Sequence, residues 1–429
     1  MSTLDVVDSP SHSFEEAHSI DQPAFAFDRA SGVLCHLTSL PGGRLGSEAL
    51  RYIDWLNKAG QRWWQILPLG PPDRSGSPYL ARSAFACSPA LLARPEARVT
   101  TSELDRFVGE HSYWAEGWAR YGGRGALENQ VRFQREWSRL RLHAVERGVQ
   151  ILGDMPFYVA RRSADHLVHP NLFRSDRAAG VPPDDWSATG QLWGNPTYNW
   201  QAMRKEGFRW WIERFRRTFE LVDAARVDHF RGFIASWSVP YGISTAMDGG
   251  WRRSPGRELF AAVQAELGRS HLVAENLGVI TPPVERLRLA LRLPGTIVLQ
   301  FVFGDEMLNR HRDEPGVENV VYTGTHDNDT TLSWWGSAGP GTRANVERAL
   351  DRAGIHEISP NWKLIRLALA HPAAVAILPV QDLLGLDGTA RFNFPGRSRG
   401  NWRWQMQPGM LTSGLARRLR DLTVASSRA

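Results

Sequence analysis

The sequence predicts an α/β fold: a (β/α)8 barrel, or TIM barrel, with insertions after the second and third strands. Three observations support this prediction. Short apolar runs rich in β-branched residues recur along the 429-residue chain, and helical periodicity follows most of them. The runs are almost continuously apolar, which indicates burial on both faces and therefore a parallel sheet. There are eight of them, the number of strands that closes such a barrel.

The predicted strands are spread along the whole chain. They lie at residues 33–37, 63–69, 149–155, 221–228, 271–275, 296–301, 319–325 and 375–380. Helical patterns fill most of the intervals, at residues 47–59, 127–147, 200–220, 256–268, 281–291, 340–353 and 361–370. A last helix at residues 411–423 closes the chain, as the final helix of a barrel does.

Two intervals are too long for simple crossovers between strands. Residues 70–148 follow the second predicted strand, and residues 157–199 follow the third. Both leave C-terminal strand ends, the face where barrel enzymes bind substrate, so we expect them to form cleft walls rather than separate domains. The expected division is therefore a disordered polar tail at residues 1–24 and a catalytic barrel at residues 25–429.

Composition limits the possible partners. The net charge is +6, but the arginines alternate with acids or lie on helix faces, so nucleic-acid binding is not expected. The first 20 residues lack the apolar core of a signal peptide, and no apolar run reaches the length of a membrane span. Cys35 and Cys87 form no Cys-x-x-Cys pair, which favours a reducing, cytoplasmic compartment. The sequence sets no oligomeric state.

Polar side chains gather at the predicted C-terminal ends of the strands. They include His36, Asp154, Arg226, Asp228, Glu275, Asp327 and Asp382. Burying several carboxylates on one rim is unfavourable unless some are neutralised or paired. Such a rim is typical of acid–base chemistry, of metal binding or of a grip on a polar substrate.

The pair formed by Arg226 and Asp228 is the most informative part of the rim. Two residues apart on a strand, they point the same way. The guanidinium would keep Asp228 ionised, which suits a nucleophile or a stabiliser of positive charge. This stretch taken alone is equally compatible with a structural ion pair at the end of a core strand.

Three competing chemistries find little support. Residues 326–329 could hold a divalent ion, but there is no His-Glu-x-x-His, cysteine cluster or EF-hand loop. No phosphate-binding glycine loop opens a helix. Residues 396–400 match Gly-x-Ser-x-Gly, but Pro395 precedes them and the strand–turn–helix context is missing. We therefore expect no metal site, phosphate-binding loop or serine nucleophile at this rim.

Carbohydrate chemistry fits the rim best. Glycosyl transfer needs one ionised carboxylate, one protonated carboxyl and groups that bind hydroxyls. Asp228 suits the first role, and Glu275, flanked by Ala274 and Leu277, suits the second because apolar neighbours raise a carboxyl pKa. Asp327 with His326 could clamp ring hydroxyls. The 18 tryptophans, many in Gly/Pro-rich segments, also suit sugars.

A set of ordered motifs gives the chain a family resemblance. They lie at Arg29–Val33, Thr38–Gly42, Trp64–Gly70, Ser77–Tyr79, Gly153–Pro156, Pro182–Asp184, Gly190–Pro196, Arg226–Gly232, Ala274–Gly278, Tyr322–Thr330, Gln381–Leu386 and Asn393–Gly396. With these motifs the chain resembles the 4-α-glucanotransferases (amylomaltases, or disproportionating enzymes) of glycoside hydrolase family 77, in the α-amylase clan.

The resemblance implies a retaining transfer between α-1,4-glucans or maltooligosaccharides without a cofactor. It implies Asp228 as nucleophile, Glu275 as acid/base and Asp327 as transition-state stabiliser. The sugar contacts that it implies are Arg226, His326, Tyr79, Asp154, Gln191, Trp193 and Asn393. Residues 85–153 are shorter than the family's usual segment, which bears on the acceptor subsites. An α-glucan hydrolase on the same scaffold and an inactive glycan-binding protein are the alternatives.

Overall fold

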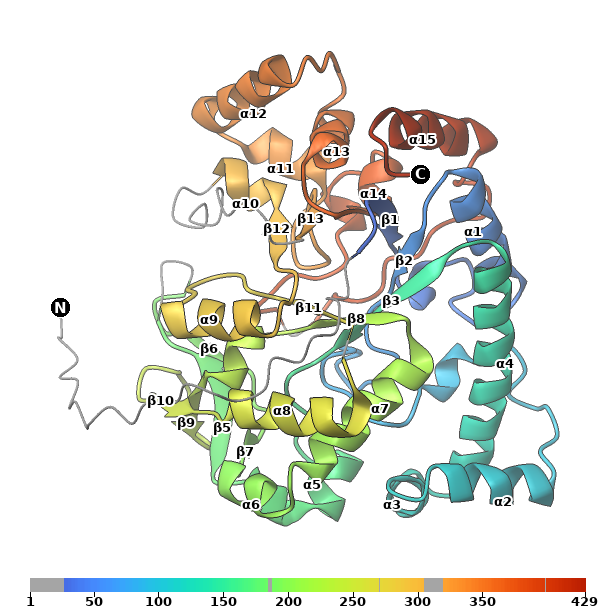
Figure 1. Ribbon diagram of the computed structural model, residues 1–429, viewed down its shortest axis with the longest axis vertical. Coiled ribbons are helices and arrows are strands. Elements are labelled where there is room, and N and C mark those ends of the chain that lie inside the picture. Colours follow the sequence, from blue (N-terminus) through green and yellow to red (C-terminus); the bar gives the residue numbers. More distant parts are fainter. Residues whose placement is uncertain (1–26, 184–186, 270, 305–318, 398) are drawn as a thin grey trace.

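All eight predicted strands are present in the computed structural model, which describes residues 27–183, 187–269, 271–304, 319–397 and 399–429. They are β1 (Ala30–Leu34), β2 (Trp63–Gln65), β3 (Gln150–Met155), β8 (Ala224–Val227), β11 (Leu272–Ala274), β12 (Thr296–Val298), β13 (Val320–Tyr322) and β14 (Val375–Pro379). Every pairing among them is parallel, in the order β11-β8-β3-β2-β1-β14-β13-β12 (Figure 1). The predicted barrel is confirmed.

The sheet closes on itself along two seams. The first and last strands, β1 and β14, pair along five residues, from Ala30 opposite Val375 to Leu34 opposite Pro379. Between β11 and β12, the N–H of Ala274 donates to the carbonyl of Pro294 at 2.8 Å, and the Thr296 hydroxyl donates to the carbonyl of Ala274 at 3.1 Å. Alternate strand residues fill the interior, while the others pack against the helices.

Helices surround the barrel and follow the predicted pattern closely (Figure 1). They include α1 (Ser47–Lys58), α4 (Ala126–Glu146), α8 (Gly256–Leu267), α9 (Pro282–Ala290), α12 (Pro340–Arg352), α13 (Pro360–Ala370) and α15 (Ser413–Ala425). Three short helices, α10 (Leu299–Gly304), α11 (Thr331–Ser337) and α14 (Val380–Leu383), directly follow or lie close to strand ends. The predicted sixth strand is therefore too long, since helix α10 begins at Leu299.

The single helix predicted at residues 200–220 is wrong. The chain forms α6 (Trp200–Lys205) and α7 (Arg209–Leu221) instead. The break falls at Gly207 and Phe208, which both take the left-handed conformation, with φ of 65° and 58°. Glycine at this position is the usual helix stop, and its N–H returns to the carbonyl of Arg204 at 3.0 Å.

The segment at residues 70–148 contributes α2 (Thr101–Glu110) and α3 (Ala115–Gly122) ahead of α4. The segment at residues 157–199 contributes α5 (Ala164–Val168), β4 (Phe173–Arg174), β5 (Arg177–Val181), β6 (Gln191–Leu192) and β7 (Thr197–Tyr198).

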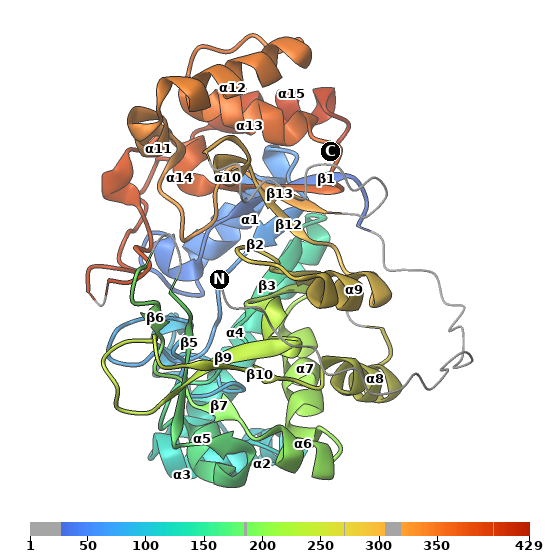
Figure 2. The same cartoon turned by 90° about the vertical axis from the view of Figure 1, so that its left-hand side faces the viewer.

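A second sheet, which the sequence analysis missed, joins two parts of the chain beside the barrel. Strands β5 and β6 pair with β9 (Ala235–Pro240) and β10 (Gly250–Arg253), in the order β10-β9-β5-β6 (Figure 2). Strands β9 and β10 come from the interval after β8, so this interval also carries an insertion.

The tail expected at residues 1–24 lies outside the described residues.

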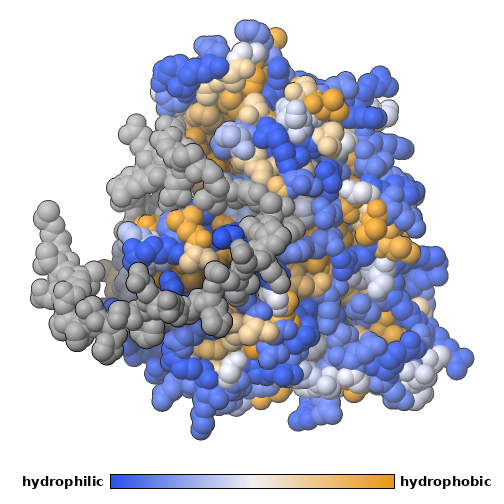
Figure 3. Space-filling view, viewed as in Figure 1, coloured by the Kyte–Doolittle hydropathy of each residue, from blue (hydrophilic) through white to orange (hydrophobic). Residues whose placement is uncertain are grey.

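The face seen in Figure 3 is mostly hydrophilic with scattered apolar side chains. Within the described ranges, no helix combines the length and apolar character that a bilayer crossing needs. Cys35 and Cys87 are both buried free thiols.

Candidate active site

Three neighbouring strands bring the predicted carboxylates to one rim. Asp154 lies near the end of β3, Asp228 follows β8, and Glu275 follows β11. Because β3, β8 and β11 are adjacent in the sheet, their C-terminal ends meet. Asp327 reaches the same rim from the loop after β13.

Arg226, near the end of β8, holds two of these carboxylates together. Its Nη1 donates to Oδ1 and Oδ2 of Asp154 at 3.1 and 2.8 Å, and its Nη2 pairs with Oδ1 of Asp228 at 3.0 Å. Burial alone would lower the pKa of Arg226, but the charges of Asp154 and Asp228 outweigh it and raise the pKa above its ordinary value. The Asp228 side chain is 30% exposed and that of Asp154 is fully buried, so only Asp228 is open to a ligand.

Asp154 links this ion pair to the segment at residues 70–148. The hydroxyl of Tyr79 donates to Oδ2 of Asp154 at 2.8 Å. Burial raises the pKa of Asp154, while the positive charge of Arg226 and the Tyr79 hydroxyl lower it. The sequence analysis placed Asp154 on the rim but did not predict its bidentate pairing with Arg226.

Glu275 is held differently, by backbone donors. The N–H of His229 donates to Oε2 at 2.7 Å, and the N–H of Leu277 donates to Oε1 at 3.2 Å. Burial raises the pKa of Glu275 to about 7, against the opposing charge of Arg226 and with the help of the negative charge on Asp228. A carboxyl of this kind exchanges its proton near neutral pH, as the apolar neighbours in the sequence indicated.

The side chain of Asp327 is contacted by polar side chains that do not contact the other rim carboxylates. Its side chain is 43% exposed. Nδ2 of Asn393 donates to Oδ1 at 2.6 Å, and Nε2 of His326 lies 3.4 Å from Oδ2. The buried His326 ring stacks on Tyr79, with centroids 5.1 Å apart, and burial lowers its pKa. Tyr79 thereby connects Asp327 and His326 with Asp154 and Arg226.

The remaining two predicted contacts come from the segment at residues 157–199. Nε1 of Trp193 donates to Oε1 of Gln191 at 3.1 Å. The Trp193 ring packs edge-on against His229, with centroids 4.9 Å apart, and the N–H of His229 binds Glu275. The ten residues predicted for the site therefore form two groups of contacts, one around Arg226 and Tyr79 and one around His229, which meet where Asp228 and His229 follow each other in the chain.

The structure adds residues that the sequence analysis did not assign to the site. Trp402 lies 5.8 Å from Tyr79 and 6.0 Å from His326 between ring centroids. In the sequence it is one of 18 tryptophans, and no motif distinguishes it. Arg391 donates to the carbonyl of Asp327 at 2.7 Å. His229 belongs to the motif around Asp228, but nothing in the sequence indicates its backbone conformation.

The side chain of Asp382 is buried, unlike those of Asp228 and Asp327. It is 2% exposed, and its carboxylate accepts bonds from the hydroxyls of Thr323 and Thr331 at 2.6 and 2.7 Å. It also accepts the N–H of Thr331, the first residue of α11, at 2.7 Å. Its function is structural. Over the described ranges, no group of three or more His, Cys, Asp or Glu is arranged to hold a metal ion.

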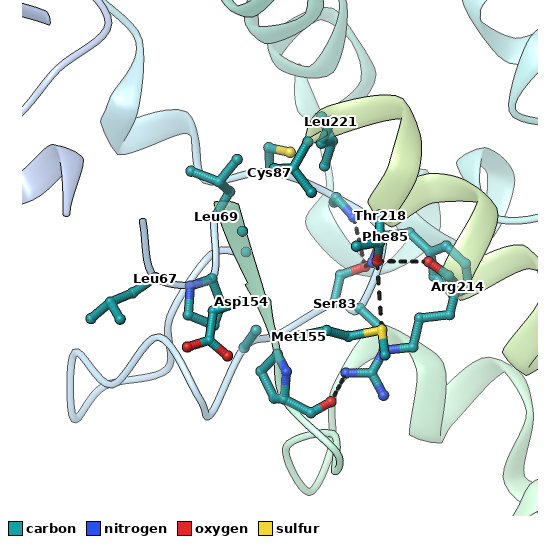
Figure 4. A pocket seen from close by; sticks show the side chains of 18 of the residues that line it. Leu67, Leu69, Ser83, Phe85, Cys87, Asp154, Met155, Arg214, Thr218 and Leu221 are labelled. Atoms are coloured by element: carbon teal, nitrogen blue, oxygen red, sulfur yellow. Dashed lines mark hydrogen bonds between the residues drawn. The ribbon is translucent and has the colours of Figure 1, made fainter. Parts of the chain in front are cut away.

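A cavity of about 80 Å³ lies beside Asp154 (Figure 4). It runs between the loop after β2 and helix α7, and its lining includes Asp154, Met155, Cys87, Arg214 and Thr218. The exposed carboxylates of Asp228 and Asp327 do not line it. The exposed rim, not this cavity, is therefore the candidate site.

A barrel with several carboxylates on its C-terminal rim is typical of the (β/α)8-barrel enzymes that act on glycosidic bonds. The chain belongs to glycoside hydrolase family 77, whose model, described as 4-alpha-glucanotransferase, matches residues 35–121 and 127–412. It is 38% identical to the 4-alpha-glucanotransferase of Thermus thermophilus, over 93% of this chain and 99% of that protein. It is 36% identical to that of Aquifex aeolicus, over 88% and 96% of the two chains.

Solved structures agree with this assignment. An amylomaltase from Streptococcus agalactiae in complex with acarbose superposes with a TM-score of 0.86 at 29% identity, covering 94% of this chain and all of that one. An amylomaltase from Corynebacterium glutamicum, at 15% identity and a TM-score of 0.75, shares the fold. The alignment with the Thermus enzyme spans 495 positions, so that enzyme contains stretches that this chain lacks.

Proposed function

We propose that this enzyme transfers α-1,4-glucan segments from a donor to the 4-hydroxyl of an acceptor glucan or glucose. The proposed route is a retaining double displacement through a glucosyl–Asp228 intermediate. The names of the relatives support glucan transfer, and the acarbose bound to the Streptococcus enzyme supports maltooligosaccharides as ligands. The observation that carries the mechanism is that Asp228 is ion-paired with Arg226 while burial raises the pKa of nearby Glu275 to about 7.

In the first step, the carboxylate of Asp228 attacks the anomeric carbon of the donor. The bond to the glycosidic oxygen breaks as Glu275 gives that oxygen its proton, and the shortened glucan leaves. The guanidinium of Arg226 lies 3.0 Å from Oδ1 of Asp228, and the 30% exposure of the Asp228 side chain leaves it open to the sugar. Glu275 can deliver a proton because its pKa lies near the pH of the medium.

In the second step, Glu275 acts as a base. Its carboxylate takes the proton of the acceptor 4-hydroxyl, whose oxygen attacks the anomeric carbon and releases Asp228. Asp327, oriented by Asn393 and His326, binds ring hydroxyls more strongly as the ring distorts. The glucosyl group and the proton are both carried by carboxyl groups, so the scheme uses no metal and no organic cofactor.

The two long segments serve as walls of one catalytic unit at residues 25–429 in this proposal. Tyr79 from the first segment touches Asp154, and Trp193 from the second touches His229, which supports a cleft between them. The buried free thiols of Cys35 and Cys87 support a reducing compartment such as the cytoplasm.

Incubation with maltotriose tests the proposed function. We expect glucose together with a ladder of shorter and longer maltooligosaccharides, while the number of reducing ends stays constant. A rise in reducing ends in step with turnover would indicate a hydrolase. An unchanged substrate, under conditions in which the protein is folded, would contradict both activities. The Asp228→Asn variant serves as the inactive control.

A further inference from the structure

The backbone leaves the regular β-ladder at His229. In the parallel pair of β8 and β11, Ala225 donates to the carbonyl of His271 at 2.9 Å, and Glu275 donates to that of Val227 at 3.0 Å. The same alternation would next join the N–H of His229 to the carbonyl of Glu275. That carbonyl instead receives the N–H of Phe230 at 3.2 Å. One extra residue is therefore inserted, as in a β-bulge.

The bulge redirects the N–H of His229 to a carboxylate. His229 has φ 51° and ψ 49°, the left-handed conformation, which is uncommon for a residue with a side chain. In this conformation its N–H points at Oε2 of Glu275, 2.7 Å away. Together with the N–H of Leu277 at 3.2 Å on Oε1, it fixes both oxygens of that carboxyl group.

The imidazole ring of His229 has a packing role. It meets Trp193 edge-on at 4.9 Å and Tyr158 at 6.1 Å between centroids. Burial, with the positive charge of Arg231, lowers the pKa of His229 to about 3, so the ring is neutral at neutral pH. Its Nε2 is buried, with no hydrogen-bond partner among the residues that the structure describes. The ring therefore joins the wall that carries Trp193 to the end of β8.

We propose that His229 is a positioning residue for Glu275, because its left-handed backbone aims the carboxyl at the glycosidic oxygen and its ring seats Trp193 beside it. This inference rests on the proposed role of Glu275 as acid and base. The charged groups that act on Glu275 are Arg226 and Asp228 at the end of β8 and Arg231 in the turn that follows. Substitution of His229 leaves all three in place.

Two substitutions separate the backbone from the ring. A β-branched residue resists the left-handed conformation, so His229→Val disturbs the bond to Glu275, whereas His229→Asn tolerates it and keeps the N–H. With maltotriose as donor, we expect kcat/KM to fall about 10- to 100-fold for His229→Val, which is no more than the ~10²–10⁴-fold that a placed general acid contributes. We expect His229→Asn to recover most of this loss in kcat/KM. We expect it to bind the acceptor more weakly, because Trp193 loses its contact with the imidazole ring.

The choice of donor separates a misplaced acid from general damage. Fluoride leaves without a proton, so the first turnover of α-maltotriosyl fluoride does not need the acid. We expect His229→Val to release the first equivalent of fluoride at a rate within about threefold of wild type. Loss of the His229 bond, which lowers the pKa of Glu275, also moves the alkaline limb of kcat/KM to higher pH in this variant.

Arg292→Val is the matched control, since Arg292 is also left-handed, with φ 52°, in an exposed turn before the start of β12, at the end of the barrel opposite the rim. It carries the same backbone penalty, and we expect it to leave the alkaline limb unmoved. His229→Ala replaces the valine variant if that protein does not accumulate. Equal loss with both donors, or an unmoved alkaline limb in His229→Val, would overturn the inference. Wild-type disproportionation of maltotriose tests the proposed function separately.

Discussion

Arg226 gives two carboxylates on one rim different surroundings. Asp154 receives two bonds from Nη1 of Arg226 and is completely buried, whereas Asp228 receives one contact and stays partly exposed. Glu275 is held by backbone N–H groups and has no direct cation partner among its hydrogen bonds. Burial raises the pKa of Glu275 to about 7, and burial also raises the pKa of Asp154 despite its contact with Arg226. The proposed division between nucleophile and acid therefore rests on two different environments: Asp228 contacts Arg226 and is partly exposed, whereas Glu275 is held by backbone N–H groups.

Glu275→Gln tests this division through both activity and stability. The pKa of Glu275 is raised from 4.5 to about 7 in the folded protein, so the stability associated with this group is fully present below about pH 4.5 and is lost as pH rises to about 7. A neutral glutamine avoids that loss. We expect transfer to fall by about 10²-fold or more. We also expect the variant to gain on the order of 1–3 kcal/mol over wild type at about pH 8 but not at about pH 4.

Thermal unfolding of both proteins across this pH range measures the effect. An equal difference in stability at acid and alkaline pH would mean that the Glu275 carboxyl is not destabilised by burial when it ionises.

At the level of elements, the loop after β13 is fixed to its neighbours by a carboxylate. Asp382, at the start of α14, binds Thr323 just beyond β13 and caps the N-terminus of α11 through Thr331. The loop between these two threonines carries His326 and Asp327. A carboxylate hydrogen-bonded from three sides thus holds the segment that presents the proposed transition-state stabiliser.

Asp382→Ala is expected to destabilise the fold and to weaken sugar binding. It leaves two buried hydroxyls and a helix N-terminus without their acceptor, which we expect to cost about 2–4 kcal/mol. Urea unfolding measures the cost, and KM for maltotriose reports on the loop. Asp387→Ala is the matched control, because Asp387 accepts the N–H of Thr389 at 2.9 Å on the exposed surface, where we expect about 1 kcal/mol or less. Equal losses for the two variants would contradict this account of Asp382.

At the level of the whole molecule, one arginine near the C-terminus bonds to both sides of the seam that closes the barrel. Arg428, which follows α15, is completely buried at the seam between β1 and β14. Its guanidinium donates to the carbonyls of Leu369, Ala373, Ala374 and Ala30 at 2.7, 2.8, 2.9 and 2.9 Å. Burial, with the charge of Arg29, lowers its pKa to about 10, so it remains charged at neutral pH.

Removal of this side chain is expected to destabilise the barrel without changing the chemistry. Arg428→Ala leaves the carbonyls at the seam unsatisfied, which we expect to cost about 3 kcal/mol or more. Calorimetric unfolding measures the loss, while kcat of the folded fraction stays near wild type. Arg417→Ala, on the exposed face of α15, should change stability by less than about 0.5 kcal/mol. If Arg428→Ala were as stable as wild type, the pairing of β1 with β14 would not depend on this side chain.

The same three scales separate what the sequence could predict from what it could not. Buried strands such as Val375–Pro379 are continuously apolar and can be predicted from the sequence. The positions of the rim carboxylates can then be predicted, because these residues lie at the C-terminal ends of the predicted strands. Strand β10 is mostly exposed and exists only by pairing with β9, so no local pattern marks it. The pairing of Arg226 with Asp154 joins residues far apart in the chain. The left-handed turn at His229 likewise depends on the tertiary contact with Glu275.

The proposed mechanism depends on a covalent intermediate at Asp228, and mass spectrometry of a trapped complex tests it most directly. In Glu275→Gln incubated with α-maltotriosyl fluoride, the first step needs no acid, while the second lacks its base. We predict that the protein gains one maltotriosyl group and that the modified peptide contains Asp228. A glycosylated peptide elsewhere, or fluoride released over many turnovers with no adduct at any time, would contradict the mechanism.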